Sequence, residues 1–151
     1  MLIRPVTKEE RLQSAQLLTI ESGDLTISAA DDAIHCDYTL QIGAEGTDGP
    51  AISITDCDEG LEAAALHVAS GDIRIRASDD CLNAANSDLS GFDFSMDTSG
   101  GTISAYTTDG DGFDSNGSMT ISGGTPPEKP DGGTPPERPD NASEPPEPGN
   151  L

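Results

Sequence analysis

Short runs in which hydrophobic and polar residues alternate recur along residues 18–124, and glycine-rich or acidic turns separate them. An alternation with a period of two predicts β-strands that bury one face. The first set of such runs has the apolar pairs Leu25/Ile27, Ile52/Ile54, Ile73/Ile75 and Ile103/Ala105. We therefore expect four copies of one strand, repeated along the chain.

Two further sets of strands complete each repeat. The second set follows an acidic turn and contains Ile34/Cys36, Leu61/Ala63, Leu82/Ala84 and Phe113/Ser115. The third contains Leu40/Ile42, Leu66/Val68, Phe92/Phe94 and Met119/Ile121. The spacing between copies fits a coil of about 21 residues with insertions, which is the period of a solenoid. The sequence therefore predicts an all-β fold, a short parallel β-helix of about four rungs with three strands per rung.

The same pattern sets the expected boundaries. Residues 18–124 form the β-helix, with insertions expected as loops at 44–50, 86–91 and 96–100. In segment 1–17, Thr7 and Glu10 have the spacing of a capping box, so residues 7–17 could form a short helix that covers the first rung. Residues 125–151 contain the tandem repeats GGTPPEKPD and GGTPPERPD and predict a disordered, proline-rich tail. This tail is either a spacer that tethers the chain to a cell surface or another module, or a tail without a partner.

Composition agrees with a thin solenoid core and excludes two classes of partner. Only 33% of residues are hydrophobic and 3% aromatic, which is little for a compact globule but enough for a narrow coil. The net charge of −21 argues against nucleic acid and anionic membrane surfaces as partners. The sequence has no apolar run long enough to span a membrane, and its first residues lack the apolar stretch of a secretory signal peptide.

The acidic turns supply the candidate chemistry, because equivalent residues of successive rungs stack on one another. Stacking the four copies predicts a first outward column of Asp31, Asp58, Asp79 and Asp109. A second column contains Asp32, Glu59, Asp80 and Asp111, and a third contains His35, Glu62, Asn83 and Asp114. Rungs lie about 4.8 Å apart, so stacked carboxylates repel one another strongly.

Calcium is the expected solution to this repulsion, since oxygen ligands in irregular geometry suit that ion. The predicted ligands are Asp31, Asp32, Asp58, Glu59, Glu62, Asp79, Asp80, Asn83, Asp109, Asp111 and Asp114. The alternative is a solvated acidic face that only maintains solubility. His35 and His67 are interpreted as surface residues, although His35 could be a ligand or lie beside one. The three cysteines are expected as buried free thiols, with a Cys36–Cys57 disulfide left open.

Two features carry a family resemblance: the repeated order of strand, acidic pair and strand, and the final segment of the predicted β-helix, DGDGFDSNGSMTISGG. In both features the chain resembles a family of calcium-binding and carbohydrate-binding right-handed parallel β-helices from secreted bacterial proteins. The resemblance covers about residues 18–124. It implies a fold like that of polysaccharide lyases, binding of acidic polysaccharides such as polygalacturonate or of cellulose, and an extracellular or cell-surface location. Ala33 and Cys81 replace the glycine that usually follows the acidic pair in that family.

Together these observations favour a non-catalytic module that binds acidic polysaccharide through calcium. One alternative is a structural stalk or adhesin fragment in which calcium serves stability only. The other is a pectate-lyase-like β-eliminase, for which Arg74 and Arg76 are the only candidate bases in the solenoid.

Overall fold

A computed structural model describes residues 12–14 and 16–124, which form an all-β, parallel solenoid of about four turns. The strands are β1 (Leu12–Ser14), β2 (Leu17–Ile20), β3 (Asp24–Ser28), β4 (Ile34–Ile42), β5 (Ala51–Asp56), β6 (Leu61–Val68), β7 (Asp72–Ala77), β8 (Leu82–Ala84), β9 (Ser95–Thr98), β10 (Thr102–Thr107), β11 (Phe113–Ser115) and β12 (Ser118–Ile121).

Within this part of the chain no helix is long and apolar enough to cross a membrane. The predicted fold class is confirmed. The predicted proline-rich tail, residues 125–151, lies outside the described residues.

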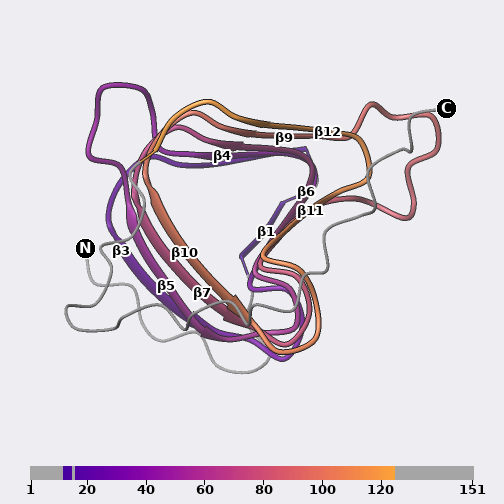
Figure 1. The fold of residues 1–151 in the computed structure, drawn as a ribbon, viewed down its shortest axis with the longest axis horizontal. Helices are drawn as coiled ribbons and strands as arrows, with labels where there is room; N and C mark the ends of the chain where they lie inside the picture. The colour runs from indigo at the N-terminus through magenta and orange to yellow at the C-terminus, as the bar shows by residue number, and fades with distance from the viewer. Residues whose placement is uncertain (1–11, 15, 125–151) are drawn as a thin grey trace, which may run out of the picture.

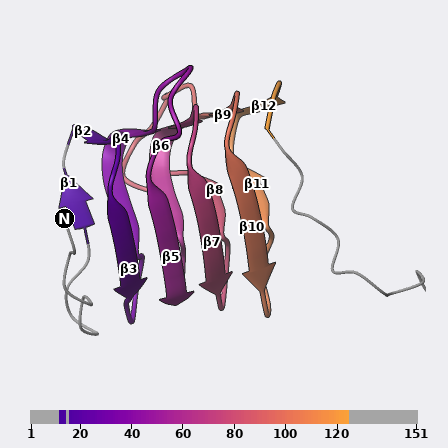
Figure 2. The same cartoon turned by 90° about the vertical axis from the view of Figure 1, so that its left-hand side faces the viewer.

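The strands wind into a coil with a triangular outline (Figure 1). One side is a four-stranded sheet in the order β10-β7-β5-β3, which Figure 2 shows face on. The other two sides belong to an eight-stranded sheet that bends at a corner of the triangle. The long strands β4 and β6 run through this bend, whereas the later rungs divide the same path between β8 and β9 and between β11 and β12. Three strand segments per rung are thus present, and two of them are fused in the rungs that contain β4 and β6.

The core consists of apolar columns that the strand register stacks directly on one another. Ile52 pairs with Leu25 on one side and with Ile73 on the other, and Ile73 pairs with Ile103. Along β7 the side chains alternate strictly between exposed and buried, as the period of a strand requires. The predicted first set of strands is therefore confirmed residue by residue.

The third strand of the third rung differs from the prediction. Met96 of β9 pairs with Leu66 and with Met119, so Met96 and Thr98 occupy the inward positions assigned to Phe92 and Phe94. Residues 96–98 are consequently strand rather than part of an insertion. Phe92 and Phe94 lie in the preceding loop, where the rings of Tyr38, Phe92 and Phe94 pack in sequence at centroid distances of 6.0 and 5.6 Å. Aromatic packing outside the coil explains why these residues are apolar.

The N-terminal prediction also needs correction. Residues Leu12–Ser14 form a strand that pairs with Ile34–Cys36, not the second half of a capping helix. The solenoid therefore begins at least one strand before the expected residue 18. Thr7 and Glu10, which suggested the helix cap, lie outside the described residues.

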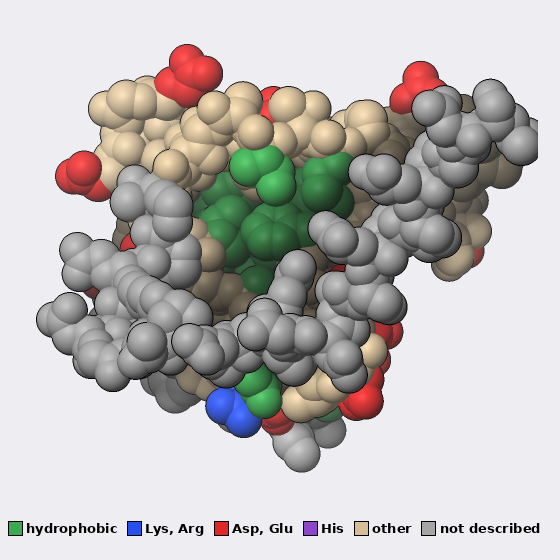
Figure 3. All heavy atoms as spheres, in the orientation of Figure 1, with side chains coloured by type: hydrophobic (Ala, Val, Ile, Leu, Met, Phe, Trp, Pro, Cys, Tyr) green, Lys and Arg blue, Asp and Glu red, His purple; other side chains and the backbone are tan. Residues whose placement is uncertain are grey.

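The last rung leaves part of the core uncovered within the described chain. Met119 and Ile121 of β12 are 42% and 63% exposed, and Ile103 and Phe113 are only partly buried. Figure 3 looks onto this end of the coil and shows apolar side chains in the hollow enclosed by the rung. The N-terminal rungs differ, since their inward side chains from Leu25 onward are buried.

Candidate metal centre

The acidic turns stack at one corner of the triangle, between the four-stranded sheet and the second strand of each rung. The backbone N–H of Asp58 donates to the carbonyl oxygen of Asp31 at 3.1 Å, and that of Asp79 donates to the carbonyl oxygen of Asp58 at 3.0 Å. Their spacing is thus held by a backbone ladder. The fourth turn is one residue longer and places Gly110 against Asp79 and Asp80, where a Cβ atom would come within 2.5 Å of the backbone of Asp79.

The third predicted column is confirmed by the strand register. His35 of β4 pairs with Glu62 of β6, which pairs with Asn83 of β8, which pairs with Asp114 of β11. These side chains point outward because the flanking apolar residues of each strand face the core. The column runs beside the acidic turns along the height of the coil.

Burial separates the predicted ligands into two groups. The first column, Asp31, Asp58, Asp79 and Asp109, is exposed throughout, as the solvated-face alternative supposes. The second column is half-buried at Asp32, Glu59 and Asp80, and exposed at Asp111. The third column is half-buried at His35, Glu62 and Asp114, and buried at Asn83. The second and third columns therefore form the enclosed part of the acidic corner.

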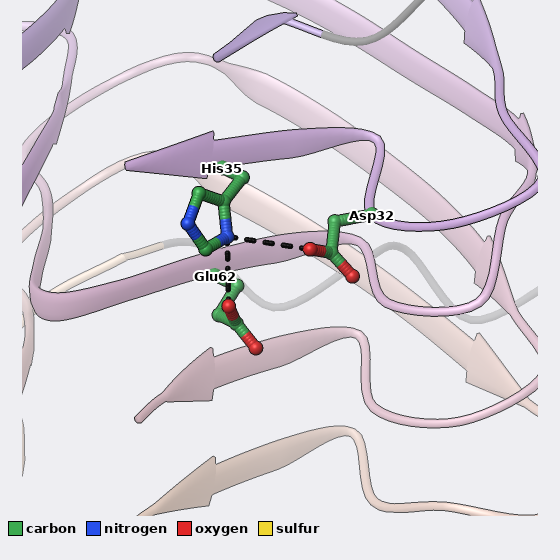
Figure 4. Close-up of side chains that lie close together, drawn as sticks. All are labelled: Asp32, His35 and Glu62. Atoms are coloured by element: carbon green, nitrogen blue, oxygen red, sulfur yellow. Dashed lines mark ion pairs between the residues drawn. The ribbon is translucent and has the colours of Figure 1, made fainter. Parts of the chain in front are cut away.

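His35 lies among three carboxylates at the upper end of this corner, and Figure 4 shows two of them, Asp32 and Glu62. Its Nδ1 atom is 2.7 Å from Glu62 Oε1 and 3.3 Å from Asp32 Oδ2, and its Nε2 atom is 3.0 Å from Asp37 Oδ1. The neighbouring carboxylates of Asp32 and Glu62 raise the pKa of His35 from 6.5 to about 10, against the opposing effect of burial. In the absence of a metal ion, the imidazole of His35 is thus protonated and positively charged at neutral pH.

The prediction that His35 is a surface residue underestimated its burial and the number of its contacts. Its side chain is 15% exposed, and it lies at the centre of the one group of three metal-ligating side chains found in the described chain, Asp32–His35–Glu62. The signal in the sequence was its position, because the predicted stacking already placed it beside Glu62 and three residues after Asp32.

Below His35, two glutamates and an asparagine connect the second and third columns. Burial is the main reason that the pKa of Glu59 rises from 4.5 to about 8, and the nearby Glu62 carboxyl raises it further. Asn83 opposes this by donating from Nδ2 to Glu59 Oε2 at 3.1 Å. The other amide atom, Asn83 Oδ1, is buried and has no hydrogen-bond partner. An amide oxygen in this state is an available ligand for a cation.

The lower end of the corner is acidic, and among the described residues no ion pair joins its carboxylates to a base. Asp80 Oδ1 accepts a hydrogen bond of 2.7 Å from the backbone N–H of Asp111. Burial raises the pKa of Asp80, and the charges of Asp79, Asp114 and Asp111 raise it further. Asp80 and Asp111 of the second column and Asn83 and Asp114 of the third thus bring carboxylate and amide oxygens to neighbouring positions of the last two rungs, and oxygen is the ligand that a hard divalent cation prefers.

The arginines lie elsewhere. Both are exposed on β7 in the four-stranded sheet, where Arg74 Nη2 is 3.0 Å from Asp72 Oδ2 and the guanidinium of Arg76 lies 4.9 Å from the ring centre of Tyr106. The acidic turns follow the ends of the strands in this sheet, and the third column lies on the other sheet.

A shallow polar cleft of about 390 Å³ follows the outer face of the third strands. Its floor is an outward column of Thr19, Gln41, His67 and Asp97, and the loop after β4 forms one wall. His67 therefore faces this cleft rather than the acidic corner. The cleft adds a surface of hydrogen-bonding side chains that the repeat pattern alone did not reveal.

The cysteines are buried and free, as expected. Cys57 and Cys81 donate to backbone carbonyl oxygens of Arg76 and Tyr106 at 3.5 and 3.3 Å. Burial raises the pKa of both thiols, so neither has the character of a metal-binding thiolate.

Comparisons with protein-family models, curated proteins and solved structures found no match to this chain. The resemblance to calcium-binding β-helices therefore stays a prediction beyond the level of the solenoid fold. Any function has to be inferred from the acidic corner and its surroundings.

Proposed function

We propose that this chain is a non-catalytic module that binds calcium at the lower acidic corner and holds an acidic polysaccharide through the bound ion. The observation that supports this most is the Oδ1 atom of Asn83, which is buried without a hydrogen-bond partner on a residue that pairs directly with Asp114. A solvated acidic face would not need an amide oxygen turned away from water.

Electrostatics supports a cation at this position. Two carboxylates on rungs about 4.8 Å apart repel by about 1 kcal/mol in water and by about 3–4 kcal/mol at a protein surface of moderate dielectric. His35 offsets this repulsion for Asp32 and Glu62. Among the described residues no ion pair joins Asp80, Asp111 or Asp114 to a base, so a divalent ion is the natural counter-charge.

The choice of an acidic polysaccharide as ligand rests on the sign of the electrostatic field at the acidic corner. A chain with a net charge of −21 repels a uronate, whereas bound calcium reverses the local charge and can accept one sugar carboxylate as a ligand. The polar cleft on the third strands, around the bend of the same sheet, offers hydrogen-bonding side chains for sugar hydroxyls. Cellulose is a weaker candidate, because the solenoid offers few exposed aromatic rings for stacking.

The position of Arg74 and Arg76 favours binding over β-elimination. A lyase base has to reach the carbon next to a uronate held by calcium. Both arginines are on the four-stranded sheet and already contact Asp72 and Tyr106. An extracellular location, and tethering through the proline-rich tail, are further parts of this proposal that follow from the resemblance and the tail sequence.

Calcium titration by calorimetry tests the metal part. We expect the double variant Asp80→Asn/Asp114→Asn to lose at least tenfold in calcium affinity, because it removes two charged ligands from one site. The matched control is Asp24→Asn/Asp88→Asn, which removes the same charge from exposed positions outside the corner. Equal affinities for the two double variants would reject the site.

Retention on a polygalacturonate gel tests the sugar part. We expect retention in calcium and release in chelator. Calcium binding without retention would favour the structural stalk, and formation of unsaturated sugar product at alkaline pH would favour the lyase.

A further inference from the structure

We propose that Asp32, His35 and Glu62 form a second metal site, selective for a borderline transition ion such as Zn²⁺ and distinct from the calcium site. This proposal goes beyond the proposed function and does not depend on it. It rests on the ligand types, their rigid placement and the partner of the second ring nitrogen of His35.

The three ligands converge from rigid parts of the fold (Figure 4). His35 and Glu62 are direct neighbours across the β4–β6 pairing, and Asp32 lies in the turn that leads into β4. The backbone N–H groups of Ala33 and Ile34 donate to the carbonyl oxygens of Glu59 and Gly60 at 2.8 and 3.0 Å, which fixes this turn on the next rung. The ligand atoms of the three side chains lie within 4.8 Å of one another.

The spacing suits a small four-coordinate ion. Bonds of about 2.0–2.2 Å from zinc to nitrogen and oxygen place tetrahedral ligands about 3.3 Å apart. The distance from Nδ1 to Asp32 Oδ2 is already 3.3 Å, and that to Glu62 Oε1 is 2.7 Å. A small rotation of the Glu62 side chain therefore brings both carboxylate oxygens to tetrahedral spacing from Nδ1, and the three ligand atoms already lie within 4.8 Å of one another.

The second ring nitrogen is held as in known metal sites. Ligating histidines usually contact a carboxylate or carbonyl through the other ring nitrogen, which fixes the ring and its tautomer. Asp37 Oδ1 does this at 3.0 Å from Nε2. The Nδ1 atom is buried, and the carboxylate oxygens of Asp32 and Glu62 lie at ion-pair distance from it. The ring is thus oriented with Nδ1 toward the two oxygen ligands.

The imidazole nitrogen of His35 determines which class of metal ion the site would prefer. Zinc and cobalt accept one nitrogen with two carboxylates, whereas calcium and magnesium take oxygen ligands. The same corner therefore offers an oxygen-only site around Asn83 and a mixed nitrogen and oxygen site around His35.

Cobalt and zinc titrations of the calcium-saturated full-length chain test the proposal. We expect Co²⁺ to give visible d–d absorption bands, and Zn²⁺ to displace it and to move the Nδ1 resonance of His35 in nitrogen-detected NMR. His35→Gln should weaken Zn²⁺ binding at least tenfold while calcium affinity stays within twofold of the parent. His67→Gln removes the other histidine of the chain and is the matched control, expected to bind Zn²⁺ as the parent does.

Three outcomes would overturn the proposal. Zinc affinity that is equal in His35→Gln and His67→Gln would place the ion elsewhere. An intense cobalt–thiolate charge-transfer band would assign it to the cysteines. An unchanged His35 resonance at saturating Zn²⁺ would mean that the cluster is a set of ion pairs only. Loss of the calcium site alone would leave these readouts intact, so the two proposals fail separately.

Discussion

At the scale of single residues, one histidine divides the acidic corner into two electrostatic regions. His35 brings a positive charge to Asp32, Glu62 and Asp37, whereas the charges that act on Asp80 are those of the carboxylates of Asp79, Asp111 and Asp114. Repetition predicted the column that contains His35, because stacking depends on spacing alone. It could not predict the raised pKa, since that depends on how far each side chain is buried.

The metal-free protein should lose stability as pH rises. The pKa of His35 is raised from 6.5 to about 10 and that of Glu59 from 4.5 to about 8, so the folded state holds more protons than the unfolded state between these limits. Each contribution is complete below the unfolded pKa and disappears as pH passes the folded one. We expect the free energy of unfolding in chelator to fall by on the order of 2–4 kcal/mol between pH 6 and pH 8.5.

Urea denaturation across this pH range measures the effect. The range ends at pH 8.5 because the buried thiols of Cys57 and Cys81 add their own pH dependence above it. His35→Gln should flatten the upper part of the profile. A stability that is constant or rises with pH in the parent chain would show that His35 is not charged in the folded state.

At the scale of the elements, the sequence predicts a strand well where the chain repeats and poorly where it is interrupted. All four copies of the first strand pair as expected, because each has two apolar residues in an uninterrupted alternation. The third strand of the third rung was misplaced because Phe92/Phe94 and Met96/Thr98 both alternate. The choice between them is made by contacts with Tyr38 and Leu66, which lie far away in the sequence.

The corner before β7 should tolerate substitution poorly. Gly71 has a φ of 120°, and a Cβ atom there would lie 2.7 Å from the carbonyl oxygen of Pro50. We expect Gly71→Ala to destabilise the chain by roughly 2–4 kcal/mol, through backbone strain and this clash together.

The matched control is Gly23, which occupies the corresponding corner before β3. Its φ is 103°, but a Cβ atom there would have no neighbouring atom within 4 Å among the described residues. Gly23→Ala should therefore cost only about 1–2 kcal/mol, from backbone strain. Thermal and urea unfolding of both variants measure the difference, and equal losses would mean that close packing against Pro50 is unimportant.

At the scale of the whole molecule, stability should depend on the ions that the corner binds. Ligands that bind only the folded state raise its stability by mass action. We expect removal of calcium by chelator to lower the melting temperature by about 10 °C or more at neutral pH. Calorimetry with and without added calcium measures this, and an unchanged melting temperature would favour a solvated acidic face.

The uncovered last rung should make the chain self-associate at high concentration. Ile121 is 63% exposed on β12, whose outer edge has no strand partner among the described residues. Ile121→Lys should reduce association in sedimentation experiments with little change in melting temperature, since the side chain is already mostly in solvent. Thr120→Lys adds the same charge at a neighbouring exposed position and is the control; an equal reduction in that variant would attribute the effect to net charge.

The shared register of β3, β5 and β7 has a consequence for how such a chain changes in evolution. Asp24, Ala51 and Asp72 occupy one column, so loss of residues 51–71 would bring β3 against β7 with every inward side chain still facing its counterpart. The same deletion would remove Glu62 and leave His35 opposite Asn83. The fold can therefore gain or lose whole coils by insertion or deletion. The side-chain cluster at the acidic corner depends on the order of particular coils, so the same deletion abolishes it.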